Sequence, residues 1–336
     1  MINRCEEEVK SLWIKKYGDK PEVTIKCMAY NQEEYIESAL DSFLLQITNF
    51  PFEIIVHDDA STDHTTEKIM QYARKYPSIV KPIIETENQY SKKDGSLNRI
   101  INEKIKGRYI ALCEGDDYWT DSNKLQKQYD AMEKHQDIDI CAHTVKRINA
   151  NTGKFCGYIQ PSKRDCIFSV KEVILGGGEF VGTNSLFFRR EIIYNEPLFR
   201  KMLEIDYTLQ VEGALRGGML YIASCMSDYR VLAKNSWSSG LNKKYIDEFR
   251  KQWILVVKQI DTDTEYKYHE SIINYMIRDK IDSAILLKDF ELLNDNECKE
   301  YYKKMKGKKR IIYYLKVNYP RLFIKIKSIV KKVKYQ

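Results

Sequence analysis

The sequence predicts an α/β protein with a mostly parallel central sheet, followed by a helical C-terminal part. Three observations favour this fold class. Short runs rich in β-branched and aromatic residues alternate with segments of helical periodicity over the first part of the chain. The helical segments are long enough to connect parallel strands by right-handed crossovers. Polar residues also follow directly after three of the strand-like runs, where an open parallel sheet binds its ligand.

The elements follow from this alternation. The first half is predicted to contain strand 23–29, a helix starting at Asn31 with Glu34 as its capping-box partner, strand 52–56, helix 64–76, strand 79–84, helix 96–106 and strand 109–113. An antiparallel portion is then expected, with helix 124–136, strand 138–148, a turn at 150–153, strand 186–188, a helix from 204, and strands 219–222 and 225–231. Helices 243–260, 264–288 and 296–305 complete the pattern.

The strand at 109–113 ends in Glu114-Gly115-Asp116-Asp117, which places three carboxylates within four positions. Like charges this close repel and raise each other's pKa. A bound cation offsets that repulsion, and the hard oxygen ligands suit Mg²⁺ or Mn²⁺. The alternative is an acidic turn before the helix that begins near Asn123, and the motif alone does not decide between the two.

Two further polar clusters follow strands. Tyr30-Asn31 comes after the first strand, and Asp58-Asp59 comes after the second. A carboxylate at this edge can accept a hydrogen bond from a uracil N–H or from ribose hydroxyls. Helix capping is the alternative for the following segment 61–63, but it leaves the two preceding acids unexplained.

The charge distribution separates the body of the chain from its end. The net charge is +7, yet residues 306–336 hold eleven Lys or Arg and no acid, which leaves 44 basic against 48 acidic residues elsewhere. An acidic body opposes nucleic-acid binding. The tail has an apolar stripe between its lysines, and Pro320 should split it. It is predicted to lie on an anionic membrane surface; a solvated terminus is the alternative.

No apolar run reaches the length of about 18 residues that a membrane span requires. The first twenty residues are polar and charged, which argues against a signal peptide. The eight cysteines form no C-x-x-C pair and indicate thiols in a reducing compartment. The predicted location is therefore the cytoplasm, with peripheral attachment to the inner face of the cell membrane.

The segments VTIKCMAYN, EIIVHDDASTD and YIALCEGDDYWTDSNKLQKQ resemble the inverting family 2 glycosyltransferases of the GT-A fold, over roughly residues 22–235. The resemblance implies a nucleoside diphosphate sugar at the strand ends and a divalent metal on the acidic motif. The family's D-x-D falls on Glu114 to Asp116, so that Asp116 takes the metal position and Glu114 faces ribose or a metal-bound water. Asp59 matches the acid placed against the nucleobase. The complete nucleotide-binding set implied is Tyr30, Asn31, Asp58, Asp59, Glu114 and Asp116.

The second half of the resemblance concerns the acceptor and the diphosphate. Asp206 matches the family's catalytic base, although an acid in a first helical turn needs no further role. The family often has a histidine shortly after its Tyr-Arg pair, where this chain has Leu232. The candidates on the acceptor or diphosphate side are Asp117, Thr183, Asn184, Arg230 and Trp237, and a structural role remains the alternative for Arg230.

The predicted organisation is a GT-A domain at 1–240, with a nucleotide-binding half (22–118) and an acceptor half (119–240), a helical extension at 241–305 and the basic tail at 306–336. The predicted activity is metal-dependent transfer of a hexosyl or N-acetylhexosaminyl unit from a UDP-sugar to a growing surface glycan, as in capsule or O-antigen assembly on a lipid. Two alternatives stay open. A nucleotidyltransferase is disfavoured by the lack of a glycine-rich phosphate loop, and a non-catalytic nucleotide-sugar-binding membrane adaptor would not need Asp206.

Overall fold

The computed structural model describes residues 3–14, 17, 18, 20–234 and 243–335. The chain divides into two compact units, Met1–Leu241 and Asn242–Gln336. Each is considered by itself.

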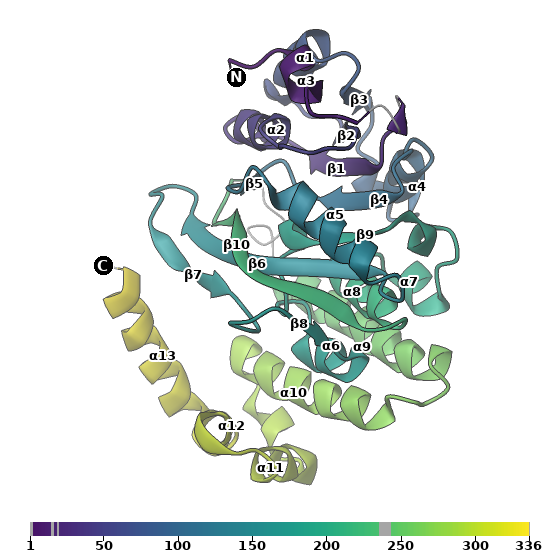
Figure 1. Ribbon diagram of the computed structural model, residues 1–336. Coiled ribbons are helices and arrows are strands. Elements are labelled where there is room, and N and C mark those ends of the chain that lie inside the picture. Colours follow the sequence, from purple (N-terminus) through teal and green to yellow (C-terminus); the bar gives the residue numbers. More distant parts are fainter. Residues whose placement is uncertain (1–2, 15–16, 19, 235–242, 336) are drawn as a thin grey trace. The chain divides into compact units, whose positions relative to one another are not determined.

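The first unit is a mixed α/β structure (Figure 1). Its strands are β1 (Val23–Ala29), β2 (Phe52–Asp58), β3 (Val80–Ile84), β4 (Tyr109–Leu112), β5 (Tyr118–Trp119), β6 (Ile140–Asn149), β7 (Phe155–Ile159), β8 (Cys166–Phe168), β9 (Phe187–Arg189) and β10 (Met219–Val231). Its α-helices are α1 (Glu6–Lys10), α2 (Ile36–Leu44), α3 (Thr65–Lys75), α4 (Ser96–Asn102), α5 (Lys124–Lys134), α6 (Val170–Gly176), α7 (Leu198–Met202) and α8 (Asp206–Ala214). Short 3-10 turns are η2 (Tyr90–Lys92), η3 (Thr183–Ser185) and η4 (Arg190–Ile193).

The strands form one sheet in the order β3-β2-β1-β4-β9-β6-β10-β5, with β7 added beside β6 and β8 beside β10. The first four strands of the path are parallel, and β6 and β10 form a second parallel pair that Figure 1 shows as the long strands of the unit. Strand β9 is antiparallel to both β4 and β6. Strands β4 and β6 therefore run in the same direction and end at the same edge. The predicted α/β fold with a mostly parallel sheet is confirmed.

The strands β1 and β2 are buried along almost their whole length because helices cover both faces of the parallel part. Helix α2 contributes its buried apolar face, which includes Ile36, Leu40 and Phe43. This buried sheet fixes the positions of the strand ends, and the loops that follow them carry the acidic residues.

Two details differ from the sequence prediction. Helix α2 begins at Ile36 and not at Asn31, whose φ is +51°. The Asn31 side chain does not cap the helix, since its Oδ1 accepts a hydrogen bond from the backbone N–H of Thr62 at 2.7 Å. The two strands expected after residue 218 are one strand, β10, with register shifts between Ile222 and Ser227. Both differences come from pairing with distant segments, which local periodicity does not reveal.

The second unit is helical. It contains α9 (Lys243–Asp263), α10 (His269–Leu287), η6 (Phe290–Leu293), α11 (Asn296–Lys303), α12 (Gly307–Asn318) and α13 (Pro320–Tyr335). Pro320 separates the last two helices, as predicted, and opens α13 at a position where its missing N–H costs nothing.

Helix α12 belongs to the core of this unit. Val317 is buried in one cluster with Ile281, Ile285 and Leu293. Lys316 Nζ pairs with Asp282 Oδ1 at 2.5 Å, which ties the basic helix to α10. The segment 306–336, expected to be a separate tail, therefore contributes its first helix to the fold of the second unit.

We expect the two helices of this segment to differ in their effect on stability. Deletion of residues 306–336 should lower the thermal stability of the second unit, because it uncovers the apolar side chains beneath Val317. Deletion of 320–336 alone should cost less, since it leaves α12 in place. Thermal unfolding and amide exchange of α10 measure both effects. Equal stability of the two truncated forms would contradict this assignment.

Candidate active site

The acidic motif lies at the carboxyl end of β4. The backbone N–H groups of Cys113 and Gly115 donate to the carbonyls of Lys26 and Met28 at 3.2 and 2.9 Å, so that the loop continues the pairing with β1. Gly115 packs against the loop after β1, and a Cβ there would stand 2.3 Å from Gln32 Oε1. Any side chain there would have to displace Gln32 and would crowd Ile36 and Ala29, so glycine allows this close approach. The neighbouring side chains of Glu114 and Asp116 are thereby held at the sheet edge.

The carboxylates of Glu114, Asp116 and Asp117 lie together, with one oxygen of each within 4.8 Å of the others. Burial raises the pKa of all three, and the charge of Asp116 raises the pKa of both Glu114 and Asp117 further. The Arg230 guanidinium opposes this rise at Asp116. A cluster of ionisable oxygens held together against its own repulsion has the donor set of a hard divalent cation. The residues therefore fit the predicted Mg²⁺ or Mn²⁺.

Asp117 differs from the other two acids because its oxygens already have partners. Its Oδ1 accepts from the backbone N–H of Arg230 at 2.7 Å, and its Oδ2 accepts from Asn184 Nδ2 at 3.0 Å. Asn184 is fully buried and also donates to the carbonyl of Asp228 at 3.0 Å. The Asn184 amide thus joins the loop after β4, η3 and β10, and its predicted sugar contact stays a prediction. Asp117 has the same connecting role, which leaves Glu114 and Asp116 to face a ligand.

Arg230 is a further connecting residue. Its Nη1 donates to the carbonyl of Asp116 at 2.7 Å and its Nη2 to Ser38 Oγ at 2.9 Å. The guanidinium carbon lies 4.5 Å from the centroid of the Tyr118 ring. These contacts support the structural alternative for Arg230 over a diphosphate contact. Leu232, at the position of the family histidine, is 63% exposed. Trp237 lies outside the described residues.

Asp206 opens helix α8 and lies near the acidic motif. Thr183 Oγ1 donates to Asp206 Oδ2 at 2.7 Å, and the backbone N–H of Tyr207 donates to Oδ1 at 2.8 Å. Burial raises the pKa of Asp206. These two hydrogen bonds lower it and so offset part of that rise. The charge of Asp206 in turn raises the pKa of Glu114. The structure therefore brings Thr183 and Asp206 together beside Glu114, from segments that are far apart in the sequence.

The loop before Asp206 is held by a polar chain that starts in the middle of β1. Lys26 Nζ donates to Asn98 Oδ1 at 2.6 Å and to Asn102 Oδ1 at 3.2 Å, and Asn98 Nδ2 donates to Glu204 Oε2. Burial lowers the pKa of Lys26 to about 8. A lysine inside a central strand is costly unless it is paired. Here its partners connect the sheet through α4 to the loop that carries Asp206.

The acids at the end of β2 stabilise loops. Asp58 is fully buried and accepts from the backbone N–H of Ser61 at 3.1 Å and from the hydroxyl of Thr66. Asp59 accepts from the backbone N–H groups of Gln89 and Tyr90 at 2.6 and 3.0 Å. Asp58 is therefore a loop anchor, and its predicted nucleotide contact stays a prediction. Each carboxylate oxygen of Asp59 can still accept a further hydrogen bond, but the side chain is almost fully buried.

The other predicted nucleotide contacts follow β1. Tyr30 is 41% exposed, so its ring is free to meet a ligand. Asn31 joins the two loops at this edge: its N–H donates to Ser61 Oγ at 2.9 Å, and its side chain accepts from Thr62. These contacts give Asn31 a structural role, and its predicted nucleotide contact stays a prediction.

Tyr229 is a site residue that the sequence reasoning missed. It is partly buried in β10, between the carbonyl of Asp228 and the N–H of Arg230 that bind Asn184 and Asp117. Burial and the charges of Glu114, Asp116, Asp117 and Asp206 raise the pKa of its hydroxyl. Successive side chains of a strand point to opposite faces, so Tyr229 lies on the face opposite Arg230. This alternation is the sequence signal that could have identified Tyr229.

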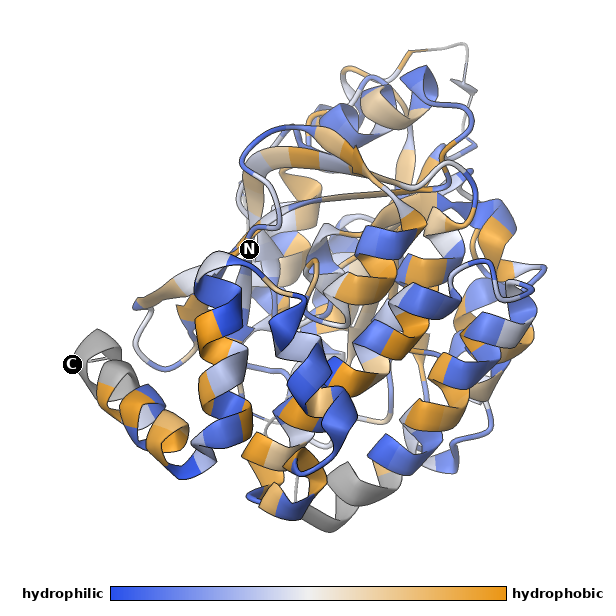
Figure 2. Ribbon diagram, turned by 90° about the horizontal axis from the view of Figure 1, so that it is seen from below, coloured by the Kyte–Doolittle hydropathy of each residue, from blue (hydrophilic) through white to orange (hydrophobic). Residues whose placement is uncertain are grey.

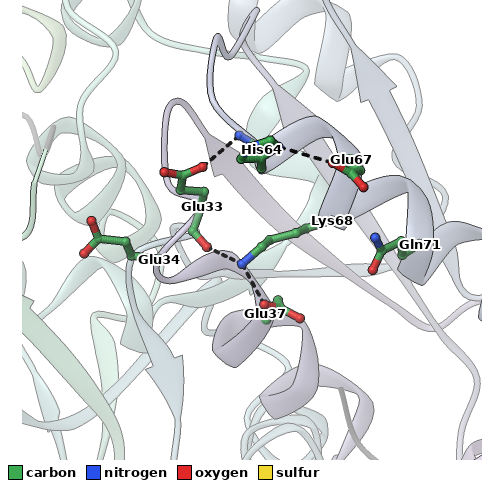
Figure 3. A pocket seen from close by; sticks show the side chains of 7 residues that line it. All are labelled: Glu33, Glu34, Glu37, His64, Glu67, Lys68 and Gln71. Atoms are coloured by element: carbon green, nitrogen blue, oxygen red, sulfur yellow. Dashed lines mark hydrogen bonds and ion pairs between the residues drawn. The ribbon is translucent and has the colours of Figure 1, made fainter.

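A surface hollow of about 460 Å³ lies near the start of α2 and α3 and is separate from the acidic motif. Figure 3 shows its lining side chains: Glu33, Glu34, Glu37, His64, Glu67, Lys68 and Gln71. Lys68 Nζ pairs with Glu37 Oε2 at 2.7 Å, and the backbone N–H of His64 donates to Glu33 Oε2 at 2.9 Å. These contacts offset part of the acidic charge and fix the loop beside Asn31.

Comparison with known proteins identifies the family. The sequence profile of Glycosyl transferase family 2 matches residues 25–194, which include the acidic motif and Thr183. The chain belongs to this family. An uncharacterised protein of Mycobacterium tuberculosis (strain H37Rv) is 37% identical over 235 residues, covering 69% of this chain and 63% of that protein. The glycosyltransferase family member described here thus spans less than two thirds of that relative's length.

Two further comparisons bear on the fold and the family. The E. coli protein WfgD, named as a UDP-Glc:α-D-GlcNAc-diphosphoundecaprenol β-1,3-glucosyltransferase, is 26% identical over 260 residues, which are 76% of this chain and 92% of WfgD. S. aureus TarS (residues 1–349), solved with UDP, has a TM-score of 0.59 at 14% identity and covers 90% of this chain and 87% of its own. The likeness to TarS shows the GT-A fold.

The contact between Thr183 and Asp206 leads to a prediction on pH dependence. A base must be ionised, so with Asp206 as the predicted base activity should fall as the pH drops through its pKa. Thr183→Val removes a hydrogen bond to the ionised carboxylate, raises its pKa and should move the acidic limb of the pH–rate profile to higher pH. Thr183→Ser should restore the wild-type profile. An unchanged limb in the valine variant would show that Asp206 does not set it.

Proposed function

We propose that this family 2 glycosyltransferase moves a sugar from a UDP-sugar to a hydroxyl of a growing, lipid-linked surface glycan, with inversion at the anomeric carbon. The observation that carries the proposal is the meeting of Glu114 and Asp116 with Asp206 at one edge of the sheet. Glu114 and Asp116, on the side of the diphosphate, thereby lie close to Asp206, which would take the proton. The names of WfgD and of the TarS complexes with UDP and UDP-GlcNAc support a UDP-sugar donor.

The donor side would consist of Tyr30, Asp59, Glu114 and Asp116. Asp116 would ligate Mn²⁺ or Mg²⁺, with Glu114 directed at the ribose or at a metal-bound water. When bound, the cation compensates the negative charge of the leaving diphosphate. The exposed Tyr30 ring offers a face to the nucleobase, and Asp59 offers a carboxylate to its N–H. Arg230 would act indirectly, because it fixes the carbonyl of Asp116.

The acceptor side would be built around Asp206. Its carboxylate accepts the proton of the acceptor hydroxyl while that oxygen attacks the anomeric carbon in line, and the bond from this carbon to the diphosphate oxygen breaks. In-line attack inverts the configuration. Thr183 holds one carboxylate oxygen in place, and burial, by raising the pKa, makes Asp206 a stronger base than an exposed aspartate. The sugar moved would be a hexosyl or N-acetylhexosaminyl unit.

The two alternatives account for less of the site. A non-catalytic adaptor needs the nucleotide-sugar contacts but has no use for a buried aspartate held by a threonine beside them. A nucleotidyltransferase would use the acids at the strand end but leaves Asp206 without a role. The pairing of Thr183 with Asp206 therefore favours sugar transfer.

Paired substitutions separate donor binding from chemistry. Asp116→Ala should abolish Mn²⁺- or Mg²⁺-dependent UDP binding, because it removes the ligand atoms of the cation. Asp206→Asn should keep UDP binding and lower turnover on the order of 10²-fold or more, as expected for loss of a general base. UDP affinity by calorimetry and transfer by UDP release measure the two effects. Asp130→Asn on the exposed face of α5 is the matched control.

Two outcomes would contradict these assignments. Unchanged metal-dependent UDP affinity in Asp116→Ala would remove the cation from this motif. Wild-type turnover in Asp206→Asn would place the base elsewhere.

We also propose that the end of the chain binds an anionic membrane surface, which would bring the site to a lipid-linked acceptor at the inner face of the cell membrane. Among the described residues, no helix combines the length and the apolar character needed to cross a bilayer. In α13, however, Leu322, Ile326 and Ile329 are 49, 43 and 54% exposed, and Lys325 and Lys327 lie between them on the surface. Figure 2 shows this mixture of apolar and hydrophilic residues along the described part of the helix. Such a surface suits anionic lipid headgroups.

Vesicle co-sedimentation tests the membrane proposal without deleting any part of the fold. Lys325→Glu/Lys327→Glu should reduce binding to phosphatidylglycerol vesicles, and wild-type binding should weaken as salt rises because exposed charges are screened. Lys251→Glu/Lys258→Glu in α9 changes the net charge equally and should retain binding. Equal sedimentation of the two double variants would refute a specific role of α13.

A further inference from the structure

The hairpin formed by β6 and β7 stands at the active-site end of the sheet. Since β6 runs parallel to β4, its second half points toward the edge that carries the acidic motif. Strand β7 pairs with this second half, from Val145↔Ile159 to Ile148↔Phe155, and Figure 1 shows it beside β6. The Val145 side chain abuts Gly182, where an added Cβ would stand 2.9 Å from its Cγ2. Thr183, the partner of Asp206, follows directly.

Two aromatic side chains of the hairpin are unusually open to solvent. Phe155 and Tyr158 are 53 and 51% exposed, and their ring centroids are 5.0 Å apart. Single exposed apolar residues need no explanation, but two aromatic rings in contact on a strand form a continuous apolar face. Aromatic rings of this kind combine apolar area with little conformational entropy, and the C–H face of a pyranose ring is their natural partner.

The charge along the hairpin segment has one sign. Residues 144–164 contain five Lys or Arg and no acid. Of these, Lys154, Lys163 and Arg164 are exposed, whereas Lys146 pairs with Asp228 Oδ2 at 2.9 Å. The body of the protein is acidic elsewhere, so this cluster is a local reversal of charge. Lys154 directly precedes Phe155, whereas Lys163 and Arg164 follow β7 and directly precede Asp165. Exposed cations on the same segment as an apolar face complement a ligand that carries anionic groups on a sugar.

The aromatic pair is linked to the acidic motif through a row of paired residues across the sheet. Tyr158 lies opposite Lys146 on β6, Lys146 opposite Asp228 on β10, and Asp228 opposite Tyr118 on β5. Tyr118 donates its hydroxyl to Asp228 Oδ2 at 2.8 Å. Tyr118 also stacks under the guanidinium of Arg230, which binds the Asp116 carbonyl. One row of directly opposed side chains thus leads across the sheet from the motif to Tyr158.

We propose that the hairpin residues 144–164 bind the acceptor, and that this acceptor is an anionic glycan. Its sugar rings would stack on Phe155 and Tyr158, and its phosphate or carboxylate groups would pair with Lys154, Lys163 and Arg164. The inference rests on the proposed function, because it presumes that a glycan hydroxyl is delivered to Asp206. A lipid diphosphate and a phosphodiester-linked chain present the same chemistry to this surface.

Binding to dextran phosphate tests the proposal, with neutral dextran and inorganic polyphosphate as the sugar-only and charge-only probes. Binding is measured by affinity electrophoresis of the full chain carrying Lys325→Glu and Lys327→Glu, two substitutions that reduce the contribution of α13. Dextran phosphate should bind more tightly than either single-feature probe. Phe155→Ala/Tyr158→Ala should weaken it about tenfold, which corresponds to ~1.4 kcal/mol. Lys154→Glu should weaken dextran phosphate but not neutral dextran.

The control is Tyr194→Ala, which removes a 60% exposed tyrosine at the opposite edge of the sheet and should change nothing. UDP affinity is measured for every variant: its retention shows that the donor site is intact, and its absence in the parent protein would count against the proposed function instead. Wild-type affinity for dextran phosphate in the double alanine variant would overturn the proposal, as would equal binding of polyphosphate.

Discussion

Electrostatic repulsion among four carboxylates is the constraint on which the rest of the site depends. Glu114, Asp116, Asp117 and Asp206 meet at one end of the sheet, and burial raises the pKa of each. Gathering them costs free energy in the unliganded protein. The fold compensates this cost because β1, β2 and β4 are buried, paired strands that hold their ends together. A cation and a diphosphate substrate would turn the same arrangement into a binding site.

The acids are sorted by their partners. Asp117 accepts from two protein groups and joins β4 to β10 and η3, whereas Glu114 and Asp116 remain directed at the ligand side. Arg230 lowers the repulsion without occupying either of them, since it binds a carbonyl and a hydroxyl. Asp206 belongs to a different helix and is held from the sheet through Lys26, Asn98 and Glu204. Donor and acceptor groups are thus positioned by different hydrogen bonds, although η3 contributes to both through Asn184 and Thr183 and the Asp206 charge reaches Glu114.

Much of this could be predicted from local pattern, and the remainder depends on long-range contacts. The strands, their parallel order and the acids at their ends follow from periodicity and from the edge that parallel strands share. The roles of Asn184 and Asp58 do not, because both are polar residues at a plausible position whose hydrogen bonds go to other parts of the fold. The same applies to the basic tail: composition identifies its charge, but only packing shows that Val317 joins a core. Tyr229 was overlooked because nothing in its neighbourhood in the sequence is acidic except Asp228.

Proton release on cation binding is the most direct test of a metal site at Glu114 and Asp116. Burial and the neighbouring carboxylates raise the pKa of Glu114 to about 8, so this group retains a proton near neutral pH that a cation must displace. Titration calorimetry with Mn²⁺ and UDP in two buffers of different ionisation enthalpy measures the protons released. We predict net release near neutral pH that declines as the pH rises above the raised pKa values, because the acids are then already ionised. Binding of Mn²⁺ without proton release, or with release unchanged in Asp116→Ala, would contradict a cation site on these carboxylates.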